Sequence, residues 1–174
     1  MRPFNGIKPQ DIVILLKLVT MGDGRWRHVD LADALGLSQT EISFAMDRCR
    51  TAGLIDSDKK RVIKPALLEF LIHGLKYVFP AKPGPVCRGI ATAHSAPPMS
   101  RVIVAATDDH YVWPCEQEGK ARGQAIEPLY PNAPLAALTD SKLHELLALA
   151  DVLRTGRTRE HRSEEHTSEL QSQR

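Results

Sequence analysis

Hydrophobic residues in the first half of the chain recur every three or four positions, which is the spacing of amphipathic helices. Four such runs precede residue 80, and they span residues 8–24, 28–36, 39–52 and 64–79. Pro9 suits the first turn of the first run, and Gly36 and Gly53 stand where the second and third runs end. The pattern therefore predicts four helices in residues 8–79.

A short turn and a hairpin are predicted on either side of the third run. Ser38 has the chemistry of a helix N-cap, and Glu41, three residues later, would complete a capping box. After Gly53, two β-prone pieces, Leu54-Ile55 and Val62-Ile63, flank the polar turn DSDKKR at residues 56–61. Such a pattern is typical of a hairpin. The predicted order is two helices, a three-residue turn, a third helix, a hairpin and a fourth helix.

The pattern changes at Pro80, because PAKPGPVCRGIATAHSAPPM (80–99) is too rich in proline and glycine for long helices. We expect residues 80–135 to form a Pro-rich extended arm or a small β element, with a short strand at 101–106 and extended pieces or turns at 111–114 and 124–134. Helical spacing returns at about 138–154, so residues 136–160 are predicted to form a C-terminal helix. Its apolar stripe could pack within the chain or pair with a second copy. The predicted fold class is mainly α (α+β).

The segment RSEEHTSELQ at residues 162–171 is polar and lacks helical amphipathicity. It matches the translation of a sequencing-library adapter, AGATCGGAAGAGCACACGTCTGAACTCCAG, codon for codon. We therefore expect residues 161–174 to be a disordered, artefactual tail that contributes nothing to function.

Composition places the chain among soluble globular proteins, with 43% hydrophobic and 25% charged residues. No apolar run reaches the roughly 18 residues of a membrane-spanning helix, and the three cysteines are too few and too scattered for a disulfide framework. These features predict a cytoplasmic protein without membrane contact. Residues 1–77 contain 12 Lys or Arg and 9 Asp or Glu, a modest basic excess that permits DNA binding.

The residues that suggest enzymatic chemistry do not form a known pattern. Cys87, His94, His110 and Cys115 lack the paired spacing of structural zinc sites. His94 and Ser95 are adjacent along the chain, which is not a nucleophile–base geometry, and neither a phosphate loop nor a dinucleotide fingerprint occurs. We therefore predict no catalytic residues, no metal and no cofactor, and no enzymatic activity.

The predicted order of elements is the layout of a winged helix-turn-helix, in which the third helix enters the major groove of DNA. The exposed face of residues 39–52 would present Gln39, Thr40, Ser43, Asp47 and Arg50. Glutamine can pair with adenine, and short hydroxyls are adaptable donors. Lys59, Lys60 and Arg61 at the tip of the 56–61 turn would contact phosphates, and Arg27 would add a contact before the second helix.

The stretch LADALGLSQTEISFAMDRCRTAGLI (31–55) resembles the DNA-binding core of MarR-like bacterial transcriptional regulators, in which LA..LGLS...VS..L..L...GLI recurs. The resemblance covers residues 8–64 and implies sequence-selective binding of double-stranded DNA by a homodimer. It adds Ser38 and Phe44 to the implied DNA-binding residues. Two positions depart from the pattern: Phe44 stands where these regulators often carry a basic or polar residue, and Asp47 adds negative charge to the DNA face.

The sequence thus predicts a bacterial regulator that acts by occupying an operator through the helix at 39–52 and the basic wing at 56–61. The alternative is a winged helix that binds another protein, as in an antitoxin or an assembly module, without contacting DNA. Exposure of Phe44 and a wing on a different face from Gln39 and Ser43 would favour that alternative. The sequence specifies neither the operator nor an effector.

Overall fold

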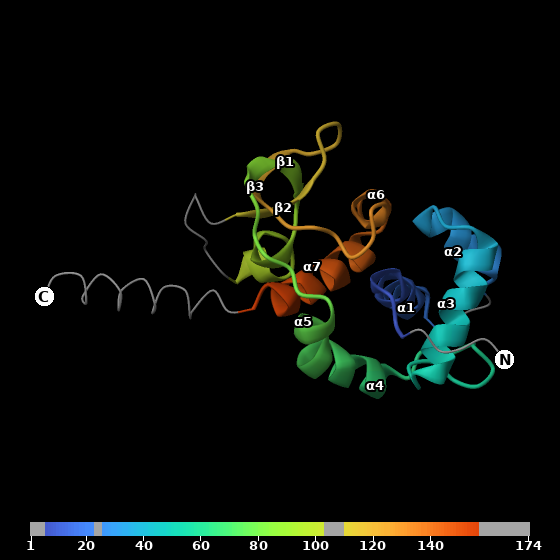
Figure 1. The fold of residues 1–174 in the computed structure, drawn as a ribbon. Helices are drawn as coiled ribbons and strands as arrows, with labels where there is room; N and C mark the ends of the chain where they lie inside the picture. The colour runs from blue at the N-terminus through green and yellow to red at the C-terminus, as the bar shows by residue number, and fades with distance from the viewer. Residues whose placement is uncertain (1–5, 23–25, 103–109, 157–174) are drawn as a thin grey trace, which may run out of the picture.

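The computed structural model describes residues 6–22, 26–102 and 110–156, which form a mixed α+β structure (Figure 1). Its α-helices are α1 Pro9–Met21, α2 His28–Leu35, α3 Gln39–Thr51, α4 Lys64–Glu69, α5 Leu75–Val78, α6 Ala133–Thr139 and α7 Ser141–Thr155. A π-helical turn, Phe70–Gly74, joins α4 to α5, and 3-10 turns lie at Ala93–Ser95 and Met99–Arg101. The strands are β1 Val86–Ala91, β2 Tyr111–Pro114 and β3 Ala121–Ala125.

The first three predicted helices are confirmed to within three residues at each end, whereas the fourth, predicted at 64–79, is interrupted by the π-helical turn Phe70–Gly74. Gly22 and Gly36 follow α1 and α2 with φ angles of 72° and 64°, a conformation that glycine adopts at little cost. Leu37, in the turn between α2 and α3, is partly buried against the core. The tail expected at 161–174 lies outside the described residues, as does most of the strand expected at 101–106, of which Arg101 ends a 3-10 turn.

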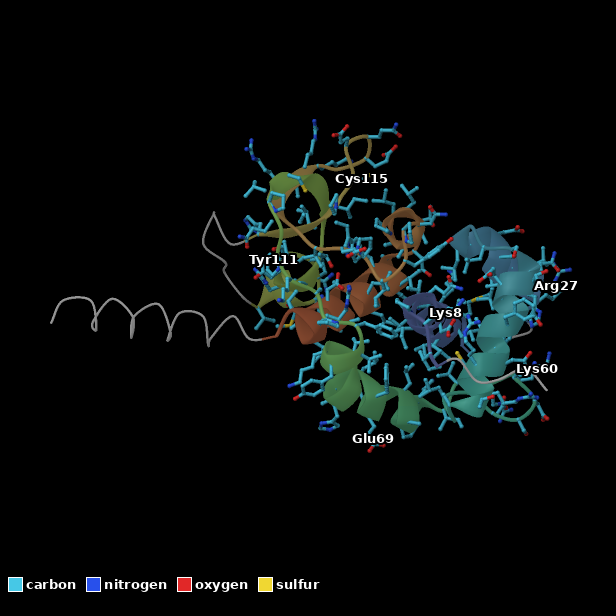
Figure 2. All side chains as sticks on the ribbon, in the orientation of Figure 1. Lys8, Arg27, Lys60, Glu69, Tyr111 and Cys115 are labelled. Carbon is cyan, nitrogen blue, oxygen red and sulfur yellow. The ribbon has the colours of Figure 1, made fainter. Side chains whose placement is uncertain are left out.

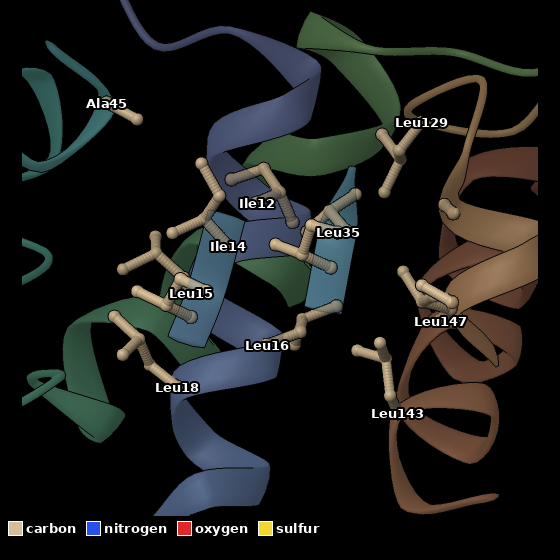
Figure 3. Packing of buried hydrophobic residues seen from close by; sticks show 14 of the residues in the cluster. Ile12, Ile14, Leu15, Leu16, Leu18, Leu35, Ala45, Leu129, Leu143 and Leu147 are labelled. Atoms are coloured by element: carbon tan, nitrogen blue, oxygen red, sulfur yellow. The ribbon is translucent and has the colours of Figure 1, made fainter. Parts of the chain in front are cut away.

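Helix α1 lies at the centre of the molecule, between α2 and α3 on one side and α7 on the other (Figure 1). Every residue from Asp11 to Leu16 is buried, so α1 is covered on more than the single stripe that the spacing predicted. Leu16 approaches Leu143 and Leu147 of α7, as Figure 3 shows. The second buried face exists because α7 returns to cover α1.

The predicted C-terminal helix is divided by Asp140 into α6 and α7. The Asp140 carboxylate accepts the backbone N–H of Leu143, which caps α7, and binds Lys17 Nζ of α1 at 2.7 Å. Leu143 is fully buried and Leu147 is 2% exposed, both in the core shared with α1. The apolar stripe therefore packs within the chain.

The strands form a small barrel in which β1 pairs antiparallel with both β2 and β3, and β2 and β3 pair in parallel. β2 lies at the extended piece expected at 111–114, whereas the strands β1 and β3 were not predicted. The closure needs close backbone approach at two glycines: a Cβ at Gly89 would collide with the carbonyl of Trp113, and one at Gly123 with that of His110.

A buried polar network joins the barrel to α7. The Asp151 carboxylate, 1% exposed, accepts the Thr92 hydroxyl at 2.7 Å and the Trp113 indole N–H at 2.6 Å. Arg154 binds the other oxygen at 2.6 Å and donates to the backbone carbonyl of Phe79. Burial raises the pKa of Asp151, and these donors oppose that effect by favouring the carboxylate.

Across the described ranges, no helix is long and apolar enough to cross a bilayer.

Candidate nucleic-acid interface

The orientation of α3 is fixed by a buried face and by polar contacts on one flank. Ile42, Ala45 and Met46 are fully buried, as the spacing predicted. On the adjacent flank, the Glu41 carboxylate accepts Gln10 Nε2 of α1 at 2.7 Å, so it does not complete the expected capping box. Arg48 lies further along the helix and also points to α1.

Arg48 makes the most buried ion pair of α3. Its Nε and one terminal guanidinium nitrogen donate to the two carboxylate oxygens of Asp11 at 2.8 and 2.7 Å. Asp11 is fully buried and also accepts the backbone N–H of Lys8, while the Asp11 hydrogen bond raises the pKa of Arg48. Because this pair is bidentate and screened from water, it holds α3 against α1 in one orientation.

The remaining face of α3 is open. At 100° per residue, Gln39, Ser43, Asp47 and Arg50 lie in one row, with Thr40 and Phe44 beside them. Gln39, Thr40 and Arg50 are exposed, whereas Ser43, Phe44 and Asp47 are half-buried. Ser38 is exposed as well, and its hydroxyl accepts the backbone N–H of Glu41 at 3.1 Å as the N-cap. The sequence-predicted residues of α3 thus share one continuous surface.

The predicted hairpin after α3 is short and is organised by Asp56. Ile55 and Val62 form an antiparallel bridge, and the backbone N–H of Asp56 donates to the carbonyl of Arg61. The Asp56 carboxylate accepts the backbone N–H groups of Lys60 and Arg61 at 2.7 and 3.1 Å, which lowers its pKa. These bonds fix the turn that carries the three basic residues.

Two side chains of this turn contact the rest of the N-terminal region. Lys59 Nζ binds Asp47 Oδ1 of α3 at 2.6 Å, and Arg50 approaches the same oxygen at 3.1 Å. The hydrogen bond from Lys59 lowers the pKa of Asp47. Lys60 Nζ lies 5.8 Å from the centre of the Trp26 ring, within cation–π distance. The turn therefore lies beside the open face of α3.

Arg27 stands at the start of α2, where its guanidinium pairs with Asp30 at 3.1 Å. The Asp30 carboxylate also accepts the backbone N–H of Arg27, and the Arg27 side chain remains largely exposed. Figure 2 places Arg27 and Lys60 along the same edge of the molecule as α3, away from the barrel residue Tyr111. Arg61 is exposed at the end of the turn.

Sequence reasoning finds the open face but misses the residues that position it. From the sequence, Asp11 is explained by the helix dipole alone, and Arg48, Trp26 and Asp56 have no assigned role. Asp11 lies beside the predicted stripe of α1 rather than on it, so the sequence does not signal its burial or its need for a partner. Asp47, interpreted as a departure from the family pattern, is the acceptor for two basic residues.

A second polar cluster lies in the barrel, where a cavity of about 300 Å³ is lined by Ser95, His110 and Arg122 among others. The Ser95 hydroxyl accepts the backbone N–H of Tyr111 at 2.9 Å and lies 3.3 Å from His110 Nδ1. The imidazole seen beside the hydroxyl is that of His110, and the ring of His94 packs edge-on against Tyr111. We assign Ser95 a structural role, because its hydroxyl ties the 93–95 turn to β2.

Comparison with family models, with curated proteins and with solved structures finds no match for this chain. Within the described residues, no group of three or more His, Cys, Asp or Glu side chains is placed to hold a metal ion.

Proposed function

We propose that residues 8–79 form a winged helix-turn-helix that binds double-stranded DNA, and that the chain is a transcriptional regulator. The observation that carries this proposal is that the basic turn lies beside the open face of α3, where Lys59 reaches Asp47 at 2.6 Å. A recognition helix and a wing must share one face to contact the same duplex. The helix order, the short turn at Leu37 and the basic hairpin support the same conclusion.

In this proposal α3 enters the major groove and the 56–61 turn lies over the backbone. Gln39 and Ser43, near the N-terminal end of α3, would contact base edges. Arg50 in the last turn of α3, Arg61 of the wing and Arg27 before α2 would contact phosphates, which sets the register of α3 without reading sequence. The role is binding rather than catalysis, and regulation would follow from occupancy of an operator.

The proposal includes a homodimer, because two copies of α3 would then contact successive major grooves of a palindromic site. The contact between the copies cannot use the apolar stripe of α7, since that stripe is buried against α1. A dimer of this chain therefore uses another surface.

The test is fluorescence anisotropy of the full chain with duplex DNA from upstream of its own coding sequence, at two salt concentrations. We expect binding that weakens steeply with salt and is lost in the double variant Gln39→Ala, Ser43→Asp. Ser141→Asp, at an exposed serine on α7 outside this face, adds the same charge as a control and should bind normally. Failure of the folded protein to bind any duplex would refute the proposal.

A protein-binding module is the second candidate, and the surface of α4 and α5 favours it. Leu68 of α4, Ile72 of the π-helical turn and Tyr77 of α5 are 57%, 44% and 75% exposed. Exposed apolar groups of this size commonly mark protein contacts. Under this alternative, Leu68→Glu and Ile72→Glu would abolish partner capture, while variants of α3 would leave it intact.

A further inference from the structure

The two basic groups nearest the junction of α3 and the wing converge on a single acidic atom. Lys59 Nζ lies 2.6 Å from Asp47 Oδ1, and a terminal nitrogen of Arg50 lies 3.1 Å from the same oxygen. An oxygen that accepts from an ammonium group and a guanidinium group has the environment of a phosphate oxygen at a protein–DNA contact. The chain thus supplies an anion of its own at this point.

We propose that Asp47 occupies a phosphate-binding position, and that DNA binding exchanges its carboxylate for a backbone phosphate on Lys59 and Arg50. This inference rests on the proposed DNA-binding function and concerns the same surface. In the free protein the carboxylate satisfies both cations, and in the complex a phosphodiester oxygen takes its place. Asp47 would then lower the affinity for DNA of any sequence, because its pairs must be broken first.

The contacts around the wing indicate that Asp47 is not needed to build it. The turn is already held by the Ile55–Val62 bridge, by the two backbone N–H groups that Asp56 accepts and by the packing of Lys60 on Trp26. The Asp47 side chain is 47% exposed, and ion pairs at exposed positions contribute little to stability and exchange readily.

The backbone conformation of Lys59 supports the same inference. Its φ angle is 55°, in the left-handed region where glycine or asparagine would be favoured. A lysine at this position therefore supplies something that the turn alone does not require. Its side chain is directed at Asp47, and it is only 25% exposed.

The replacement Asp47→Asn keeps the shape of the side chain and removes its charge. One additional net phosphate contact steepens the dependence of log K on log salt by about 0.9. If the variant and the wild type bind equally at 1 M salt, the variant then binds about eightfold more tightly than the wild type at 0.1 M salt. We expect a gain of this size with a scrambled duplex as well as with the upstream duplex, because phosphate contacts carry no sequence information.

The experiment is a double-mutant cycle that combines Asp47→Asn with Lys59→Ala, measured by anisotropy on a scrambled duplex across a salt series. In the wild type, Lys59→Ala removes a phosphate contact. It also removes the Lys59–Asp47 ion pair that must break before the phosphate can bind, so the affinity for DNA should fall little. In the Asp47→Asn background the same loss should cost about eightfold, since nothing competes. Asp58→Asn removes a charge from the same turn, at an exposed residue, and measures the long-range effect of that charge.

Equal costs of Lys59→Ala in the two backgrounds, or equal gains from Asp47→Asn and Asp58→Asn, would overturn this inference while leaving DNA binding in place. Absence of binding by every variant, Asp47→Asn included, would instead overturn the proposed function. Thermal unfolding of each variant shows that it is folded; we expect Asp47→Asn to unfold within a few degrees of the wild type.

Discussion

Single residues decide how α3 is presented, and Asp11 is the clearest case. Its carboxylate is fully buried within α1, and Arg48 crosses from α3 to neutralise it. Both oxygens of the buried carboxylate accept from Arg48, so Asp11 ties α1 to α3. Buried pairs of this kind specify a geometry more than they add stability, because desolvation offsets much of the attraction.

Removing one partner of this pair should therefore be costly. We expect Asp11→Asn to lower the free energy of unfolding by about 3–5 kcal/mol, because Arg48 would keep a largely buried charge without its bidentate partner. Urea denaturation of the full chain measures the change. Arg50→Met removes an exposed pair on the same helix and should cost less than about 1 kcal/mol. Similar losses in both variants would contradict this account of Asp11.

Cys49 gives a second prediction at the same scale. It is fully buried on the inner face of α3, and burial, with a contribution from Asp11, raises the pKa of its thiol to about 12. Because the thiolate is the reactive form, Cys49 should resist a disulfide reagent at pH 8 until the protein unfolds. Mass spectrometry of the labelled protein identifies the modified cysteines. Rapid labelling of Cys49 in the native protein would show that α3 is not packed as described.

At the scale of elements, regular periodicity predicted most helices and failed where the helix is irregular. Leu67 and Leu75 are both buried although they are eight residues apart, a spacing that turns them about 80° from each other in a regular helix. The π-helical turn Phe70–Gly74 takes up one residue and brings both onto the core side. No local pattern in the sequence signals such a turn.

The elements missed after residue 80 depend on contacts between distant segments. β1 contains a glycine and an arginine, and its pairing places Arg88 opposite Arg122 of β3, which no strand propensity would suggest. The candidate site likewise combines a feature that the local sequence predicts with one that depends on distant contacts. The open face of α3 follows from helical geometry alone, whereas the Asp47–Lys59 pair depends on where the hairpin folds back.

The hairpin itself should depend on Asp56. We expect Asp56→Ala to increase amide hydrogen exchange at Lys60 and Arg61 about fivefold, because each N–H loses an acceptor worth about 1 kcal/mol. Asp58→Ala, two residues away, serves as the control. Unchanged exchange at Lys60 and Arg61 would show that the turn does not rely on the Asp56 carboxylate.

At the scale of the whole molecule, residues 8–79 share one hydrophobic core with the C-terminal helix α7. Helix α7 covers the second face of α1, and Arg154 of α7 donates to the carbonyl of Phe79 at the end of α5. The proposed DNA-binding face of α3 therefore depends on a core that the C-terminal residues complete, although the two parts are far apart along the chain.

A fragment of residues 1–79 tests this dependence. Without α7, the apolar side chains of α1 such as Leu16 would face water, and the fragment should lose the cooperative thermal transition of the full chain. Circular dichroism during heating measures the transition. A fragment that unfolds as sharply and at the same temperature as the full chain would contradict the shared core.

The central claim is that the open face of α3 and the 56–61 turn bind DNA as one surface. The most direct measurement is the change in backbone amide NMR shifts of the full chain when the upstream duplex is added. We predict the largest changes at residues 38–50 and 56–61, with smaller ones near Arg27, and little change in the barrel or on α4 and α5. Changes confined to the barrel or to α4 and α5, or none at all, would contradict the claim.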